Sequence, residues 1–143
     1  MVCLAGRSKS DSTRVTIADL PGFVNGFRVS GANGATFANV DQRIEAQYIA
    51  DCAGQPGTAQ VWVHNGTGSS RSFTLNLYYP TAVNNYASAT SFASTTVTIP
   101  IGWSKQTFSF TFSANVTNGC GLQFLLGALS AGQNITITGV QLE

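Results

Sequence analysis

The stretch Gln60-Val61-Trp62-Val63-His64-Asn65 alternates apolar and polar side chains with a period of two. This alternation is typical of a half-buried β-strand, whose successive side chains point to opposite faces of a sheet. We therefore expect Val61 and Val63 to face a core. Gln60, Trp62 and His64 would then share the opposite face, where a large aromatic side chain beside hydrogen-bonding groups indicates a contact with something outside the sheet.

Similar patterns recur along the chain between turns rich in Gly, Pro and Asn. The clearest one runs from Lys105 to Ser113, where three phenylalanines alternate with Ser and Thr. About eight or nine short strands, with no convincing helix, predict an all-β fold, an antiparallel β-sandwich with jelly-roll topology. Greek-key pairing of the first and last strands would complete the jelly roll. The other expected strands cover roughly 14–19, 26–30, 42–50, 60–65, 71–79, 94–99, 122–127 and 135–143.

Two segments are less regular. Residues 42–50 have some helical character, but a helix would give their apolar residues no clean stripe, so we predict a strand. We expect Pro80 to end the preceding strand and residues 81–93 to form a long polar loop. Tyr86 in this loop is either an exposed contact or a plug at the end of the sandwich, and Trp103 is expected to cap the core.

Composition bounds the domain and its partners. The chain of 143 residues has the size of one domain, which we place at residues 13–143, after a flexible segment or linker at 1–12. Only 9% of residues are charged and the net charge is +1. The seven scattered basic residues form no stripe that would bind nucleic acid. No apolar run is long enough for a helix to insert in a membrane.

The cysteines, the histidine and the acidic residues form no clear pattern of metal or cofactor ligands. Cys52 and Cys120 either pair or remain buried free thiols. His64, the only histidine, has no local Cys or carboxylate partner, so we predict no metal site. No cofactor is expected. A structural calcium ion stays open as an alternative, with carbonyl groups and the side chains of Asp11, Asp19, Asp41 or Asp51 as ligands.

Catalysis is not predicted. Glycoside hydrolysis needs two carboxylates flanking the bond. The only cluster of acids is Asp41, Glu45 and Asp51, and on a strand the last two would lie roughly 20 Å apart. No Gly-x-Ser-x-Gly elbow surrounds a candidate nucleophile. We therefore expect no enzyme and no catalytic residues.

Three stretches carry a family resemblance: Asp41-Gln-Arg-Ile-Glu-Ala-Gln, Gly102-Trp-Ser-Lys-Gln-Thr-Phe and the terminal Ile135-Thr-Ile-Thr-Gly-Val-Gln-Leu-Glu. Their order, between about Leu20 and Glu143, resembles a jelly-roll module of tail-fibre and other structural proteins of tailed bacteriophages. That module is similar in architecture to carbohydrate-binding domains. The resemblance implies a non-enzymatic adhesin, commonly trimeric, on a virion tail fibre or on a phage-derived fibre at a bacterial cell surface.

The expected function is therefore binding of a host or prey surface glycan by a homotrimeric fibre. The alternative is a purely structural domain for virion or fibre assembly that binds only protein. The aromatic face around Trp62 is accordingly a ligand face, a subunit interface or an intrachain contact. We expect Asn76 and Tyr78 to extend this face from a neighbouring strand. The candidate ligand-binding residues are Gln60, Trp62, His64, Asn76, Tyr78, Tyr86 and Arg43, with Gln47 as an alternative to Arg43 at the rim.

Overall fold

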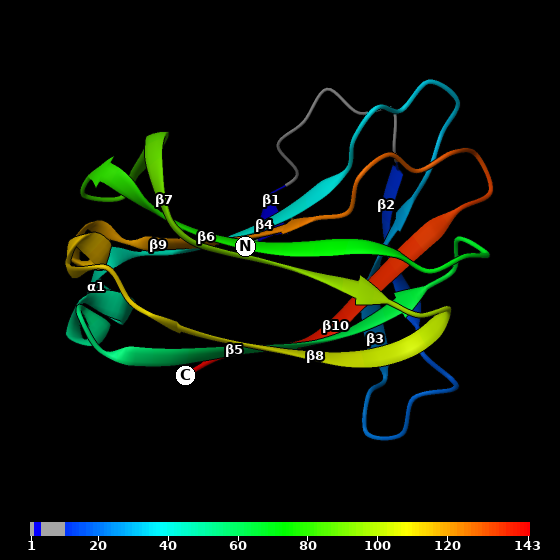
Figure 1. Cartoon of the computed structure of the whole chain (residues 1–143), viewed down its shortest axis with the longest axis horizontal. Helices are drawn as coiled ribbons and strands as arrows, with labels where there is room; N and C mark the ends of the chain where they lie inside the picture. The colour runs from blue at the N-terminus through cyan, green and yellow to red at the C-terminus, as the bar shows by residue number, and fades with distance from the viewer. Residues whose placement is uncertain (1, 4–10) are drawn as a thin grey trace.

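Ten strands form two antiparallel sheets in the computed structural model, which describes residues 2–3 and 11–143. The strands are β1 (Val2–Cys3), β2 (Asp11–Thr16), β3 (Asn25–Ser30), β4 (Asn39–Ile44), β5 (Pro56–Asn65), β6 (Arg71–Ala82), β7 (Asn85–Ile99), β8 (Gly102–Thr111), β9 (Cys120–Leu125) and β10 (Asn134–Leu142). Sheet A has the order β1-β4-β9-β6-β7, and sheet B has the order β2-β3-β10-β5-β8. Figure 1 shows the two layers, with β6 above and β5 below. The predicted antiparallel β-sandwich is confirmed.

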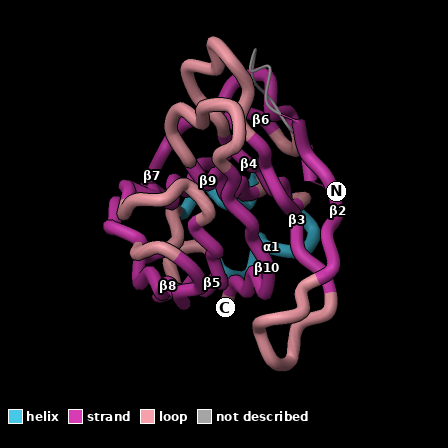
Figure 2. The backbone as a smooth tube through the Cα atoms, turned by 90° about the vertical axis from the view of Figure 1, so that its right-hand side faces the viewer, coloured by secondary structure: helices cyan, strands magenta, loops and turns pink. Residues whose placement is uncertain are grey.

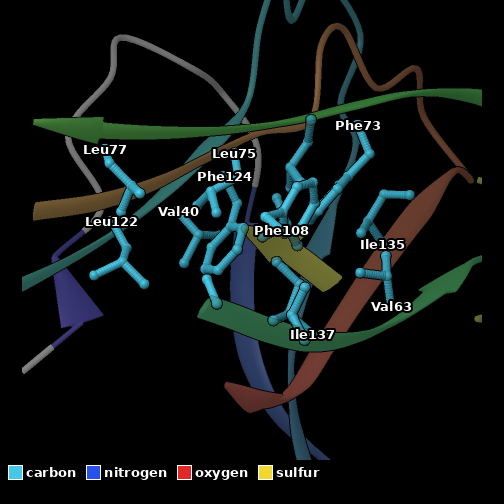
Figure 3. Close-up of a cluster of buried hydrophobic side chains, with 14 of the residues drawn as sticks. Val40, Val63, Phe73, Leu75, Leu77, Phe108, Leu122, Phe124, Ile135 and Ile137 are labelled. Atoms are coloured by element: carbon cyan, nitrogen blue, oxygen red, sulfur yellow. The ribbon is translucent and has the colours of Figure 1, made fainter. Parts of the chain in front are cut away.

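The core lies between the two sheets and follows the predicted parity. Val61 is 1% exposed and Val63 is fully buried, whereas Trp62 between them lies on the outer face and is half-buried. From sheet A, β6 contributes Phe73, whose ring stacks on Phe124 at 5.6 Å between centroids. Figure 3 shows these aromatic rings among the aliphatic side chains of both sheets. Alternation therefore assigns each strand one core face and one outer face.

The prediction of a strand over 42–50 is wrong beyond Ile44. Strand β4 ends there, and the chain enters the short helix α1 (Ala46–Ile49), followed by the 3₁₀ turn η1 (Ala50–Cys52). The Ala46 amide donates to Asn84 Oδ1 at 2.7 Å, so a side chain from a distant hairpin satisfies the start of the helix. Because this partner is 38 residues away, the local hydrophobic pattern carries no sign of it.

The predicted loop 81–93 is also wrong. Strand β6 continues through Pro80 to Ala82, and β7 begins at Asn85. Beyond Tyr78, β6 pairs only with β7, so Pro80 occupies an edge position where a missing amide donor is tolerated. Asn84 adopts the left-handed conformation that the tight turn requires, with φ of 56°. Register shifts on both sides of Tyr79 mark irregular pairing within this hairpin.

The ends of the domain differ from expectation in two respects. Strand β1 pairs with β4, and β2 begins at Asp11, so strand pairing starts before residue 13. The rest of the predicted flexible segment, residues 1 and 4–10, lies outside the described residues. The last strand does not pair with the first one, because β10 lies between β3 and β5. Figure 2 shows the β2–β3 loop (lower right) projecting from the sandwich near these strands.

The two cysteines for which pairing stayed open are free thiols. Cys120 is buried and Cys52 is half-buried. Burial, with a smaller effect of the Cys52 charge, raises the pKa of the Cys120 thiol to about 12. It therefore stays protonated at neutral pH, as an inert core side chain does. Within the described ranges 2–3 and 11–143, no helix has the length and hydropathy needed to cross a bilayer.

Candidate functional site

A pocket of about 370 Å³ opens on the outer face of sheet A. It has the size of small-molecule binding sites in general. The register of β4, β9 and β6 builds its floor from two cross-strand rows, Asp41–Gln123–Asn76 and Arg43–Gly121–Tyr78. Strand β7 adds Tyr86, Ala87, Ala89 and Ser91. In Figure 1 the tip of the β6–β7 hairpin (green, upper left) rises above this face of the sheet.

The Tyr78 ring lies on the floor because its cross-strand neighbour is a glycine. A Cβ added at Gly121 would lie 2.1 Å from Tyr78 Cζ and under 2.6 Å from two further ring atoms. Only a residue without a side chain leaves this space. The aromatic face of Tyr78 is thereby laid along the sheet surface, within the pocket.

Gly121→Ala is expected to destabilise the domain by about 1–3 kcal/mol, because the new methyl group must displace the Tyr78 ring. Urea unfolding measures this change in the free energy of unfolding. The matched control is the same substitution in a Tyr78→Ala background, where the clash is gone and the cost of Gly121→Ala should largely vanish. An equal cost in both backgrounds would show that the ring does not occupy this position.

Tyr86 is a wall of the pocket and not a residue of an exposed loop. Its hydroxyl donates to the Ile44 carbonyl oxygen at 2.6 Å and lies 3.1 Å from the Cys120 carbonyl oxygen. Its ring meets Tyr78 edge-on, with 6.2 Å between centroids, and the Arg43 guanidinium lies 5.1 Å from the ring centroid. The cation–π contact and these hydrogen bonds hold the wall in place.

Asp41 is the most buried polar side chain of the pocket, at 2% exposure. Its Oδ2 accepts a hydrogen bond from Asn39 Nδ2 at 3.3 Å, whereas Oδ1 is buried without a hydrogen-bond partner among the described residues. Burial raises the pKa of Asp41, although the Gln123 amide, the Arg43 charge and the Tyr78 hydroxyl act in the opposite direction. A buried carboxylate oxygen without a donor is costly for a folded protein, so it is a candidate acceptor for a ligand.

The remaining polar groups form a chain across the strands. Ser91 Oγ donates to Asn76 Oδ1, and Asn76 Nδ2 donates to Gln123 Oε1 at 3.4 Å. Burial and the Asp41 charge raise the pKa of the Tyr78 hydroxyl, which therefore stays protonated at neutral pH. The pocket thus presents hydroxyl and amide groups, one cation and one carboxylate around an aromatic ring.

The structure divides the seven candidate residues between two faces. Arg43, Asn76, Tyr78 and Tyr86 line the pocket of sheet A. Gln60, Trp62 and His64 lie on β5, in sheet B, on the opposite side of the molecule. The expectation that Asn76 and Tyr78 extend the Trp62 face is wrong. Strands β5 and β6 follow each other in the sequence, but they belong to different sheets.

The Trp62 face makes contacts within its own chain. Phe23, from the β2–β3 loop, packs on Trp62 with 6.3 Å between ring centroids. A Cβ at Gly139 would lie 2.6 Å from Phe23 and 3.3 Å from Trp62, so this glycine leaves room for both rings. The intrachain contact is therefore present, and the half-buried indole keeps part of its surface exposed.

Trp103 does not cap the core as predicted. It lies on β8 opposite His64, on the outer face of sheet B, and its ring meets the imidazole edge-on at 5.1 Å. Its indole Nε1 donates to Asp19 Oδ1 at 2.9 Å. Of the four Asp residues weighed as calcium ligands, none belongs to a cluster of three or more His, Cys, Asp or Glu within the part of the chain that the structure describes.

Sequence reasoning missed Asp41, Gln123 and Ser91 as residues of the pocket. The one available signal was parity, since Gln123 and Asp41 alternate with core residues on their strands. The alternation of side chains shows which face of a strand a residue lies on, but not which strands are its neighbours. It therefore could not predict that β4, β9, β6 and β7 lie side by side.

Comparison with known proteins gives the fold. The chain is similar to a CBM4 structure (TM-score 0.67, 17% identity), covering 96% of this chain and 79% of that one. It is similar to the C-terminal family 22 carbohydrate binding module of Clostridium thermocellum Xyn10B (TM-score 0.66, 15% identity, 99% and 83% covered). It is also similar to tailspike protein 4 of bacteriophage CBA120, in a structure of its enzymatically active domain (TM-score 0.69, 17% identity, 99% and 19% covered).

These similarities confirm the jelly-roll sandwich. Because all three sequence identities are 17% or lower, the similarities establish the architecture only. The ligand has to be inferred from the chemistry of the site. The chain spans only 19% of the tailspike chain. No protein-family model and no curated protein matches the chain.

Proposed function

We propose that this protein is a non-catalytic carbohydrate-binding domain whose pocket on sheet A holds a sugar. The observation that carries the proposal is the Asp41 carboxylate, buried at the floor of this pocket with an oxygen that lacks a hydrogen-bond donor. A sugar hydroxyl is such a donor. The jelly-roll fold, which carbohydrate-binding modules share, supports the same conclusion.

The surrounding groups suit a neutral sugar. The Tyr78 ring lies along the floor, where it can pack against the CH groups of a sugar ring. Asn76, Gln123 and Ser91 supply both donors and acceptors, as a ring of hydroxyl groups requires. Arg43 and Asp41 balance each other in charge, so the pocket has no excess of positive charge for an acidic polysaccharide.

The raised pKa of Asp41 predicts opposite effects of pH on binding and on stability. Binding needs the ionised acceptor, so sugar affinity should fall as the pH drops through the raised native pKa, above the ordinary value of 3.8. Stability should change in the other direction. Between the two values the native state binds more protons than the unfolded state, so the free energy of unfolding should fall as the pH rises.

Calorimetric titration with sugar and urea unfolding at several pH values measure both effects. The Asp41→Asn variant has no titrating group at this position, so neither its sugar affinity nor its stability should show this pH dependence. If the wild-type affinity were constant across this pH range, Asp41 would not be an acceptor for the sugar.

The wider role that we propose is that of a receptor-binding domain of a phage or phage-like trimeric fibre, on a virion or at a cell surface. Three weak sites on one rigid fibre would raise the apparent affinity for a host or prey glycan through effective concentration. The similarity to a bacteriophage tailspike structure and the resemblance of the three sequence stretches support this context. The alternative remains a structural assembly domain, for which the half-buried Trp62 would be a subunit contact.

A glycan array separates these functions. The wild type is expected to bind neutral saccharides, Tyr78→Ala to lose binding and Trp62→Ala to retain it. Loss in Trp62→Ala alone would place the site on sheet B, as the alternation around Trp62 predicts. Binding of no saccharide would favour the assembly role.

Light scattering tests the trimer, which should have three times the mass of 15.0 kDa.

A further inference from the structure

A second, smaller pocket of about 120 Å³ lies on the outer face of sheet B. Its floor is one continuous cross-strand row, Arg28–Thr136–His64–Trp103 on β3, β10, β5 and β8. The end of β2 and the loop that follows close it, because Val15, Thr16, Ile17 and Asp19 also line it. The Ile17 amide donates to the Val24 carbonyl oxygen at 2.9 Å, which closes the base of this loop.

The guanidinium of Arg28, the cation of this pocket, is hydrogen-bonded to a neutral hydroxyl group. Arg28 Nε donates to Thr136 Oγ1 at 3.2 Å, and this is the one hydrogen bond of its guanidinium among the described residues. Thr136 is itself 1% exposed, so it is a fixed anchor. The two terminal nitrogens of Arg28 thus remain for a partner, and a guanidinium fork matches a carboxylate with two parallel hydrogen bonds.

The one carboxylate of the pocket is engaged elsewhere. Asp19 Oδ1 accepts a hydrogen bond from the indole Nε1 of Trp103 at 2.9 Å, whereas the guanidinium of Arg28 donates to Thr136 among the described residues. His64 lies between Thr136 and Trp103 in the row, and its buried Nδ1 has no hydrogen-bond partner among the described residues. The pocket therefore combines a guanidinium, whose terminal nitrogens have no partner among the described residues, with an imidazole.

We propose that this pocket is a second binding site, which takes the carboxylate group of a small organic monoanion. Its volume holds a group of a few heavy atoms, such as a carboxylate. The Asp19 charge at its wall repels a dianion such as phosphate more strongly than a monoanion. This carboxylate is either that of a free acid or that of an acidic sugar residue, and the site does not depend on the pocket of sheet A.

Chemical-shift titration of the ¹⁵N-labelled protein tests the proposal, with sodium acetate and sodium glucuronate as probes. Glucose and phosphate are the controls, and the ionic strength is kept constant with chloride. Saturable shifts at residues 15–19, Arg28, His64 and Trp103 are expected with both carboxylates. Tighter binding of glucuronate than of acetate assigns the site to acidic sugars, and equal binding assigns it to free carboxylates.

Arg28→Gln keeps a donor for Thr136 but removes the charge. It should lower the affinity for acetate and for glucuronate at least tenfold. Arg14→Gln, at an exposed position of β2, is the matched control and should bind as the wild type does. Trp103→Phe offers a second variant, because it frees Asp19 to neutralise Arg28 and should also weaken binding.

The proposal is overturned if neither carboxylate gives saturable shifts, if phosphate gives the same shifts, or if Arg28→Gln and Trp103→Phe both bind as the wild type does. Binding of neutral sugars to sheet A is unaffected by any of these outcomes, so the two proposals fail separately.

Discussion

Replacing Asp41 with asparagine is expected to weaken sugar binding strongly while leaving the folded protein as stable as before or more stable. The carboxylate is 2% exposed, and its Oδ1 accepts no hydrogen bond among the described residues. Asn39, Gln123, Arg43 and Tyr78 compensate its desolvation only in part, and a sugar hydroxyl would supply a further donor. A hydrogen bond to a charged group contributes about 1.5–3 kcal/mol, so the affinity should fall about ten- to a hundredfold.

Calorimetric titration measures the affinity, and urea unfolding at neutral pH measures the stability. Asp51→Asn is the matched control, since Asp51 is exposed in the 3₁₀ turn η1, outside the pocket. A large loss of stability in Asp41→Asn, with sugar affinity unchanged, would mean that Asp41 serves the fold and not the ligand.

Phe73→Ala is expected to have the largest effect on folding, a loss of about 3–5 kcal/mol in the free energy of unfolding. Phe73 is 1% exposed on β6 and stacks on Phe124 at 5.6 Å, with Phe108 of the opposite sheet at 6.5 Å. Figure 3 shows Phe73 among buried side chains of both sheets, so its removal would leave a cavity between them. This loss is a large share of the roughly 5–15 kcal/mol that stabilises a domain.

Urea unfolding monitored by circular dichroism measures this loss. Phe37→Ala is the matched control, because the Phe37 side chain is 42% exposed and its removal creates no internal cavity. Equal losses in the two variants would contradict the position of the core between the sheets.

The period-two patterns gave the strands and their buried faces. Val61 and Val63 face the core, and Trp62 faces outward, because alternation is a local property of an extended chain. The short helix α1 was missed because Asn84, on a hairpin far along the chain, satisfies its first amide. The hairpin tip was missed because Pro80 lies where β6 has one neighbour only, and this depends on the sheet order.

The site could be predicted only in part, for the same reason. Tyr78, Asn76, Tyr86 and Arg43 were identified by residue type, and the structure brings them together in one pocket. Asn76, Tyr78 and Arg43 were assigned to the face of Trp62, because adjacent strands in a sequence often pair. Tyr86 was assigned to a loop, as an exposed contact or a plug at the end of the sandwich. Here β5 and β6 belong to different sheets. Asp41 was weighed only as a calcium ligand or catalytic acid, because the burial of its Oδ1 without a hydrogen-bond partner is a property of the folded state.

Chemical-shift mapping of the saccharide that binds best on the array tests the central claim most directly. Titration of the ¹⁵N-labelled protein should shift the backbone amides of Asp41, Gly121 and Gln123, on strands β4 and β9 under the pocket. It should leave the amides of Trp62 and Thr138 unchanged. Saturable shifts confined to Trp62 and Thr138 would contradict the account, since they would place the sugar on sheet B.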